Sequence, residues 1–417
     1  MRKKTSILTV SLLCLMLVSP LAEAAKQSKA QTEDADTYEL LNLFGEVMER
    51  AKVSYVEDVS DKKLIESAIN GMLSSLDPHS SFLDDQSFKY MSEQTKGKFG
   101  GLGIEVTMEN GVVKVVSPID DTPASKAGLK PGDYITNIDG KIGSKVKLTI
   151  RRINEKPLEV TLKREEIKIQ SVKNSIKADD VVYIRISSFS EDVDTMTAKA
   201  IKDAKKKLGD KLKGVVIDVR NNPGGLLDQA VNVSDLFLDK GEIVSTRSRN
   251  EEDTVKYTAK EGDIAKGLPI VVIINDGSAS ASEIVAGALQ DHKRAIILGE
   301  KSFGKGSVQT VIPLGKYGAM RLTTARYYTP SGRSIQAKGI EPDIEVKPAK
   351  VEVLDTGVGF SEAEFSNALK NETSGDKNAD QKKAEAEELA KDYQLSRAID
   401  LVKALGLYNE GLEDKRK

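Results

Sequence analysis

Three closely spaced serines are the first candidates for chemistry in this chain. Ser278, Ser280 and Ser282 lie in the stretch 275–283, between an apolar run and a helical pattern. A serine at a sharp turn that opens a helix exposes its hydroxyl near backbone N–H groups, which suits a nucleophile and an oxyanion site. The stretch also fits helix capping, with Ser280 as N-cap and Glu283 three residues on. On this segment alone, capping is favoured over catalysis.

Histidine is a poor candidate for the base that Ser280 would need. The chain has two histidines, His79 and His292. On a continuous helix rising 1.5 Å per residue, His292 would lie about 18 Å from Ser280. His79 follows Asp77-Pro78, where a turn role fits better. We therefore expect the base to be another residue type.

Lysine is the alternative base, because serine enzymes with a lysine partner exist. Lys305 lies between Gly304 and Gly306, which let the backbone turn closely around it. To act as a base near neutral pH, Lys305 must have its pKa lowered by about 3 units from ~10.4, which costs about 4 kcal/mol. Burial away from carboxylates is the usual means. An ordinary surface lysine is the other interpretation.

The segment around Lys305 also resembles a phosphate-binding loop, since residues 299–305 fit G-x-x-x-x-G-K. Such a loop must open a helix, whereas residues 307–328 alternate in a strand pattern, as at Val308, Thr310 and Ile312. The pattern therefore disfavours nucleotide binding.

The segments that carry these residues predict a layered α/β domain with a largely parallel sheet, because strands and helices alternate. Buried strands are expected at 181–186, 215–219, 269–274 and 295–298, and helices at 196–208, 226–238 and 282–292.

Composition narrows the classes of function. A length of 417 residues suggests two or three domains, and 62 basic against 64 acidic side chains give no single-sign field to attract nucleic acid. One cysteine and two histidines are too few for a Cys/His zinc site. We expect no nucleic-acid partner, no metal and no cofactor.

The N-terminus predicts export. Arg2, Lys3 and Lys4 precede an apolar run, 7–21, and Ala22-Glu23-Ala24 fits a signal-peptidase site, with cleavage after Ala24. An uncleaved anchor is the alternative, although the run is shorter than the ~20 apolar residues of a spanning helix. Cys14 lies inside the run, so the mature chain would carry no cysteine. The expected location is the periplasm or the exterior of the cell envelope.

Both ends of the mature chain carry helical patterns. Residues 26–36 read as a polar tether, and apolar residues at helical spacing then predict a helical head at Leu41, Phe44, Met48, Ala51, Tyr55, Ile65, Ile69, Met72 and Leu73. Residues 370–380 are polar, and 384–405 predict a charged helix with Leu395, Ile399 and Val402 on one face. Self-association through these terminal helices is a hypothesis.

Five ordered motifs resemble the C-terminal processing peptidases, exported serine proteases with an embedded PDZ domain. They are residues 99–104, 218–225, 277–284, 302–309 and 327–332. The resemblance implies an α/β multidomain fold whose core has a mixed sheet, as in Clp protease and crotonase. It also implies that Ser280 is the nucleophile, Lys305 the general base and Gln309 the residue that orients Lys305. For the oxyanion we expect the backbone N–H groups of Ala281 and of Gly225 or Gly224, near the end of a predicted strand.

The PDZ module departs from its family pattern. By resemblance Gly100, Gly101, Leu102, Gly103 and Ile104 hold the terminal carboxylate and begin the receiving strand, so protein substrates with apolar C-terminal tails are the expected guests. After Asp139-Gly140-Lys141, however, only Ile142-Gly143-Ser144 precede the next β-like run, too few for a groove-lining helix. We predict that tail capture is weakened or lost. A module used only for packing is the alternative.

The resulting prediction has five segments: a signal peptide, 1–24; a linker and helical region, 25–96; a truncated PDZ domain, 97–167; a serine protease core, 168–348; and a polar linker with a helical region, 349–417. The predicted function is an exported serine endopeptidase that processes or degrades proteins from near their C-termini. The alternative is a catalytically silent PDZ scaffold or adaptor.

Overall fold

The computed structural model describes residues 19–414, with gaps at 110–111, 119–121, 131, 140–144, 153–154, 164, 169, 352–388 and 390. It divides into two compact units, Met1–Phe82 and Leu83–Lys417. The predicted polar segment 370–380 and most of the predicted start of the C-terminal helix, 384–388, lie outside the described residues.

The first unit contains helices α1 (Ser19–Ser54) and α2 (Asp61–Ser74), followed by the short strand β1 (Ser81–Leu83) at the boundary. The predicted helical head is confirmed. The prediction of a tether at 26–36 is wrong, because these residues continue α1, consistent with the helix propensity of their Ala, Gln and Lys residues. Within the described residues, no helix has the length and apolar character needed to cross a membrane.

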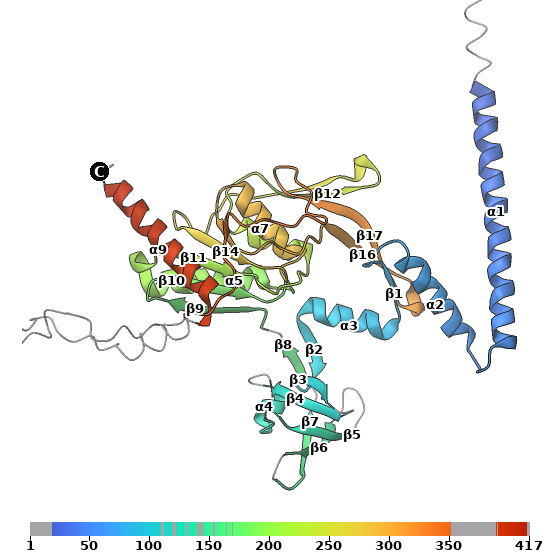
Figure 1. Cartoon of the computed structure of the whole chain (residues 1–417), viewed down its shortest axis with the longest axis horizontal. Helices are drawn as coiled ribbons and strands as arrows, with labels where there is room; N and C mark the ends of the chain where they lie inside the picture. The colour runs from blue at the N-terminus through green and yellow to red at the C-terminus, as the bar shows by residue number, and fades with distance from the viewer. Residues whose placement is uncertain are drawn as a thin grey trace, which may run out of the picture. The chain divides into compact units, whose positions relative to one another are not determined.

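A six-stranded mixed sheet forms the centre of the second unit (Figure 1). Its order is β18-β15-β14-β11-β10-β9, and all neighbours run parallel except β9 and β10. The strands are β9 (Val172–Lys177), β10 (Val181–Ile186), β11 (Gly214–Asp218), β14 (Ile270–Ile274), β15 (Ile296–Gly299) and β18 (Ile344–Glu345). The predicted α/β class with a mixed sheet is therefore confirmed.

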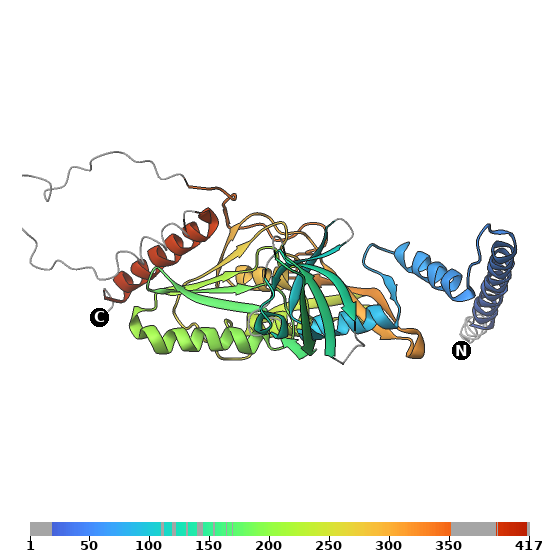
Figure 2. The ribbon, with the colours of Figure 1, turned by 90° about the horizontal axis from the view of Figure 1, so that it is seen from below.

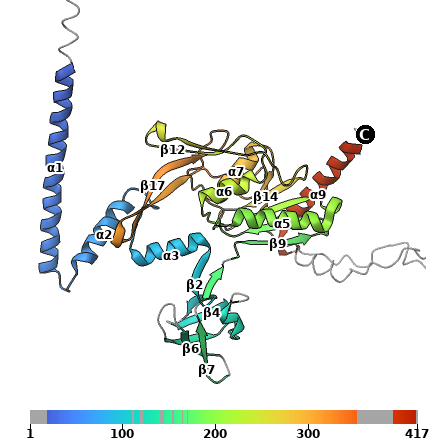
Figure 3. The ribbon, with the colours of Figure 1, turned by 180° about the vertical axis from the view of Figure 1, so that it is seen from behind.

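Helices cover both faces of this sheet, so its strands are apolar on both sides. Alternate residues of β10 enter two different cores: Val182 and Ile184 pack with the helices of one face, and Val181 packs with α9. The first face carries α5 (Val193–Leu208), α6 (Leu227–Asp235) and α7 (Ala281–Asp291), and the other carries α9 (Tyr393–Asp414). Figure 2 shows α5 and α9 on opposite sides of the sheet, and Figure 3 shows α5, α6 and α7 from behind.

The predicted C-terminal stripe lies on α9. Leu395, Ile399 and Val402 are all buried in the core that includes Val181 and Val216. This face is occupied within the chain, so it does not serve the predicted self-association.

A second, antiparallel sheet contains β12 (Glu242–Ser248), β13 (Val255–Thr258), β16 (Ser307–Pro313) and β17 (Ala319–Tyr328). The strand pattern after Gly306 is confirmed, and no helix follows Gly306 as a phosphate-binding loop would need. Single-turn 3₁₀ helices lie at Gly209–Lys211, Glu251–Asp253 and Gly315–Tyr317.

The PDZ region forms a five-stranded sheet in the order β3-β4-β5-β6-β7 and a separate β2-β8 ribbon. In the described residues, no helix separates β5 from β6, which pair as neighbours with Asp139 opposite Lys147. Gly100 and Gly101 belong to β2 and pair with β8, so of the predicted carboxylate loop only Leu102 and Gly103 lie outside a strand. The elements are α3 (Asp85–Lys96), β2 (Lys98–Gly101), β3 (Ile104–Glu109), β4 (Val112–Pro118), α4 (Pro123–Lys126), β5 (Tyr134–Asp139), β6 (Lys145–Arg151), β7 (Leu158–Lys163) and β8 (Glu165–Lys168).

Candidate active site

Ser280 occupies the turn between β14 and α7, immediately before the helix begins. Its backbone lies at φ 55° and ψ −110°, a region that costs a non-glycine residue about 1–3 kcal/mol and that is concentrated at functional sites. The helix behind it is buried at every residue from Ala281 to Gln290. Ser280 is thus both the N-cap of α7 and a strained turn residue held on a rigid element, so the two interpretations of the sequence are compatible.

The other two serines of the cluster have structural partners. The Ser278 hydroxyl donates to the Val219 carbonyl at 2.8 Å, and the Ser282 hydroxyl donates to the Asn222 carbonyl at 2.9 Å. Both side chains are fully buried. These two serines tie the turn before α7 to the loop after β11, which leaves Ser280 as the candidate nucleophile.

Glu283 joins the segment of Ser280 to the segment of Lys305. Its Oε2 accepts hydrogen bonds from the backbone N–H of Ser280 at 2.7 Å and from that of Lys305 at 2.9 Å. Its Oε1 accepts from the Ser302 hydroxyl at 2.6 Å and from the Gly304 N–H at 2.7 Å. The sequence indicated Glu283 only as a capping residue. Its link to Lys305 was missed because the two segments are separated by a whole helix and strand.

The pKa of Glu283 reflects two opposing effects. Burial raises the pKa of this fully buried carboxyl, whereas the hydrogen bonds from Ser302, Gly304, Ser280 and Lys305 lower it. Burial is the largest of these effects, so the net direction of the pKa is upward. The three backbone N–H groups can only donate, and the Ser302 hydroxyl oxygen also accepts from the Ile340 N–H.

The pKa of Lys305 is shifted in the direction that a lysine base requires. Burial lowers its pKa, the positive charge of Arg321 lowers it further, and Glu283 opposes both. The expectation of burial away from carboxylates is therefore wrong for Glu283. That carboxylate lies close enough to act on Lys305, but the net direction remains downward because desolvation is the largest effect.

Gly224 packs directly against Ser280. A Cβ on this residue would lie 2.8 Å from the Ser280 Cβ and 3.0 Å from the Ala281 nitrogen, and its φ of 105° also requires glycine. Its own N–H donates to Asn222 Oδ1 at 2.9 Å. Among the described residues, the N–H groups of Gly225 and Ala281 donate to no side chain, which makes these two better candidates for oxyanion donors than Gly224.

Gln309 lies on β16, at a register shift in the pairing with β17. Its amide nitrogen donates to the Ser307 hydroxyl at 2.9 Å and to the Thr323 hydroxyl at 3.2 Å. In the part of the chain that the structure describes, no hydrogen bond joins Gln309 to Lys305 or the Ser280 hydroxyl to the Lys305 amine. Catalytic hydrogen bonds are often long in structures without substrate.

The histidines lie in other environments. His292 ends α7, and its Nε2 lies 2.7 Å from the Glu242 carbonyl oxygen. The backbone N–H of His79 donates to Asp77 Oδ1 at 2.8 Å, as expected of a turn.

The sequence reasoning missed a charged cluster at the end of β11. Asp218 is buried and accepts from Tyr183 and Arg220, and Arg220 also binds Asp392, which precedes α9. The signal was present, because a charged residue at the end of a buried strand needs partners. Asp392, the partner of Arg220, lies 172 residues away in the sequence, just before α9.

A hollow of about 420 Å³ opens beside the candidate base. It is lined by Pro223, Asp276, Gly277, Ala279, Phe303 and Lys305. The Phe303 side chain is 64% exposed there. This hollow offers room for a substrate side chain next to Lys305.

Three family models match the chain. Peptidase family S41 matches residues 180–346, the PDZ domain matches 100–142, and the N-terminal domain of activating protease CtpB matches 15–87. The S41 match contains five of the six strands of the central sheet and every candidate catalytic residue. Fold, site and matches together define a serine peptidase with a PDZ domain.

Curated relatives are similar over most of their length. The carboxy-terminal-processing protease of Bartonella bacilliformis is 50% identical over 399 residues, covering 90% of this chain and 91% of the relative. Carboxy-terminal processing protease CtpB of Bacillus subtilis is 38% identical over 346 residues, covering 78% and 71%. The solved photosystem II D1 C-terminal processing protease is 29% identical at a TM-score of 0.46, covering 72% of this chain and 85% of that chain. The chain belongs to peptidase family S41, the carboxy-terminal processing proteases.

Proposed function

We propose that this protein is an exported serine endopeptidase that processes or degrades proteins from near their C-termini, with Ser280 as nucleophile and Lys305 as general base. The observation that carries the proposal is the bridge made by Glu283, because one carboxylate oxygen accepts from the backbone N–H of both residues. Two segments that are distant in the sequence are thereby held together.

Lys305 acts as a base in its neutral form. Its lowered pKa increases the fraction of neutral amine near neutral pH. The amine takes the Ser280 proton as the hydroxyl oxygen attacks the peptide carbonyl, and it later gives that proton to the leaving amine. The resulting acyl-enzyme is then hydrolysed by water, which restores Ser280.

The oxyanion of the tetrahedral intermediate needs fixed donors. We assign this role to the N–H groups of Ala281 and Gly225. Gly224 supports it by allowing the loop to lie against Ser280, since any larger residue would overlap the Ser280 Cβ.

Gln309 is proposed to orient Lys305. Its amide nitrogen is anchored by the Ser307 and Thr323 hydroxyls, which leaves the amide oxygen as the acceptor for a lysine amine.

The activity is tested with an unstructured protein such as casein. We expect the purified protein to degrade casein, and Ser280→Ala to lower turnover by about 10⁶-fold. Lys305→Arg should not rescue the activity that is lost without Lys305, because arginine does not deprotonate. Casein degradation that is unchanged in Ser280→Ala would refute the assignment.

Recognition of apolar C-terminal tails through the PDZ module is proposed to be impaired. The support is the direct pairing of β5 with β6, with no helix between them in the described residues. The test is a binding titration of the full-length Ser280→Ala protein with peptides that end in apolar residues. Affinity in the low micromolar range would contradict the proposal.

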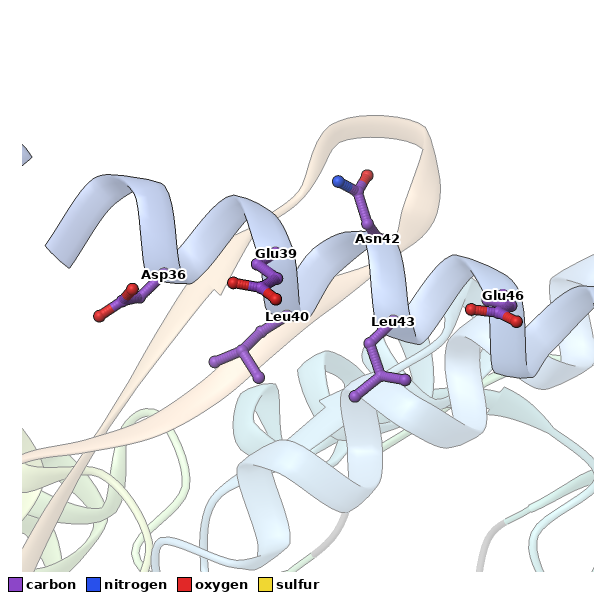
Figure 4. A pocket seen from close by; sticks show the side chains of 6 residues that line it. All are labelled: Asp36, Glu39, Leu40, Asn42, Leu43 and Glu46. Carbon is purple, nitrogen blue, oxygen red and sulfur yellow. The ribbon is translucent and has the colours of Figure 1, made fainter. Parts of the chain in front are cut away.

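Self-association is proposed to use α1. Its apolar residues Leu40, Leu41, Leu43 and Phe44 are 46–65% exposed, so much of their apolar surface is available to a partner. Figure 4 shows Leu40 and Leu43 projecting from the same side of the helix and Asn42 projecting from the other side.

Export to the periplasm or the cell-envelope exterior rests on the N-terminal residues alone. If a signal peptidase cleaves after Ala24, N-terminal sequencing of the protein from the native host begins at Ala25. A mature protein that retains residues 1–24 would contradict this proposal.

A further inference from the structure

We propose that Asp392 is a positioning residue for the oxyanion loop, residues 219–225, and that it acts through Arg220. Asp392 lies beyond the S41 match, which ends at residue 346. The inference rests on the proposed function, because the loop is assigned the oxyanion donor Gly225.

Asp392 holds Arg220 by two parallel hydrogen bonds. Nη1 of Arg220 donates to Asp392 Oδ1 at 2.9 Å, and Nη2 donates to Asp392 Oδ2 at 2.7 Å. Nη1 also donates to Gln394 Oε1 at 3.0 Å. A bidentate pair of this kind fixes both the position and the plane of the guanidinium.

Asp218 holds the neighbouring edge of the same guanidinium and shares Nη2 with Asp392. Nε of Arg220 donates to Asp218 Oδ1 at 3.1 Å, and Nη2 donates to Asp218 Oδ2 at 2.7 Å. Arg185 donates to Asp218 as well. The cluster therefore contains two arginines and two aspartates. Without Asp392 it would keep an unbalanced positive charge at a side chain that is only 16% exposed, which is costly.

Arg220 belongs to the loop that it would position. The next residue, Asn221, has φ 51°, and the buried Asn222 accepts the Gly224 N–H at 2.9 Å. A displacement of Arg220 would therefore move the residues that pack against Ser280.

The carboxylate of Asp392 is supplied by a fixed element. Ile399 and Val402 of α9 are buried against the central sheet, and the Gln394 amide donates to the Val346 carbonyl at 2.6 Å. Docking of α9 thus delivers the second carboxylate to Arg220. The C-terminal helix completes the catalytic core.

Asp392→Asn isolates the charge contact. Asp392 Oδ1 also accepts the Leu395 N–H at 3.1 Å at the start of α9, and asparagine caps helices as well as aspartate does. Asp400→Asn on the same helix is the control, because it removes the same charge from a residue whose partner is the exposed Arg397. Asp392→Ser also keeps a capping oxygen and removes the carboxylate, so it replaces Asp392→Asn in the test if the asparagine variant does not fold.

Steady-state kinetics on a quenched peptide substrate test the proposal. We expect Asp392→Asn to lower kcat by about 10-fold or more with KM changed less than about twofold, since removing an oxyanion donor outright costs about 10²–10³ in kcat. Asp400→Asn should leave both within about twofold. In an Arg220→Gln background, Asp392→Asn should lower kcat by less than about twofold, because the arginine through which Asp392 acts is already absent.

A wild-type kcat in Asp392→Asn would overturn the proposal, and so would a loss of kcat that multiplies with that of Arg220→Gln. Melting temperatures of both asparagine variants are measured alongside, and a kcat loss that only follows lowered stability would also overturn it. Ser280→Ala separates this inference from the proposed function. If Ser280→Ala cleaves the peptide, the proposed function fails. If it does not, while Asp392→Asn is fully active, only the role of Asp392 fails.

Discussion

A single buried carboxylate explains how the segments of the two candidate catalytic residues come together. Glu283 accepts hydrogen bonds from the backbone N–H groups of Ser280 and Lys305, so it does not engage their side chains. The motifs around Ser280 and Lys305 were readable in the sequence, because glycine and serine patterns are local. The bridge through Glu283 was not readable in the sequence. It depends on how α7 and β15 bring the segment of Lys305 next to the segment of Ser280.

The pH dependence of catalysis should report the pKa of Lys305. Burial and Arg321 lower this pKa from 10.5, and the base must be neutral, so kcat/KM should rise with pH through a pKa below 10.5. Arg321→Gln removes a positive neighbour and should move the rise to higher pH. Arg249→Gln, in an exposed loop, should leave it in place. A profile that Arg321→Gln does not move would contradict this account of the shift.

At the level of elements, α7 and α9 place the site from opposite faces of one sheet. The strand at 181–186 and the helix at 282–292 were predicted closely, because their apolar patterns are strong. The helix predicted at 384–405 lies partly outside the described residues; α9 continues to Asp414, beyond the predicted end, and its apolar face proved to be core. Sequence periodicity shows that a helix has an apolar face, but tertiary contacts decide what covers it.

The contribution of α9 to stability can be measured on Ile399, which is 3% exposed. Ile399→Ala should lower the free energy of unfolding of the second unit by about 2–5 kcal/mol, because it leaves a cavity against the central sheet. Leu407→Ala, on the same helix but at a residue 66% exposed, should change it by less than about 0.5 kcal/mol. Urea denaturation followed by circular dichroism measures both, and equal effects would show that α9 does not pack as described.

At the level of the whole molecule, the exposed apolar residues of α1 predict self-association. Light scattering should give a mass above that of the 45.3 kDa chain, or of the shorter mature form. Phe44→Asp should return the protein to a monomer, because a charge cannot be buried unpaired in such an interface. Tyr408→Asp, at an exposed residue of α9, is the matched control. A monomeric wild-type protein would exclude this role for α1.

The central claim is that Lys305 is the base for Ser280, and kcat/KM of Lys305→Ala on a peptide substrate tests it most directly. Lys301→Ala is the matched control, because Lys301 lies four residues earlier with an exposed partner, Glu341. We predict a loss of about 10⁶-fold for Lys305→Ala and less than about twofold for Lys301→Ala. Full activity of Lys305→Ala would contradict the claim.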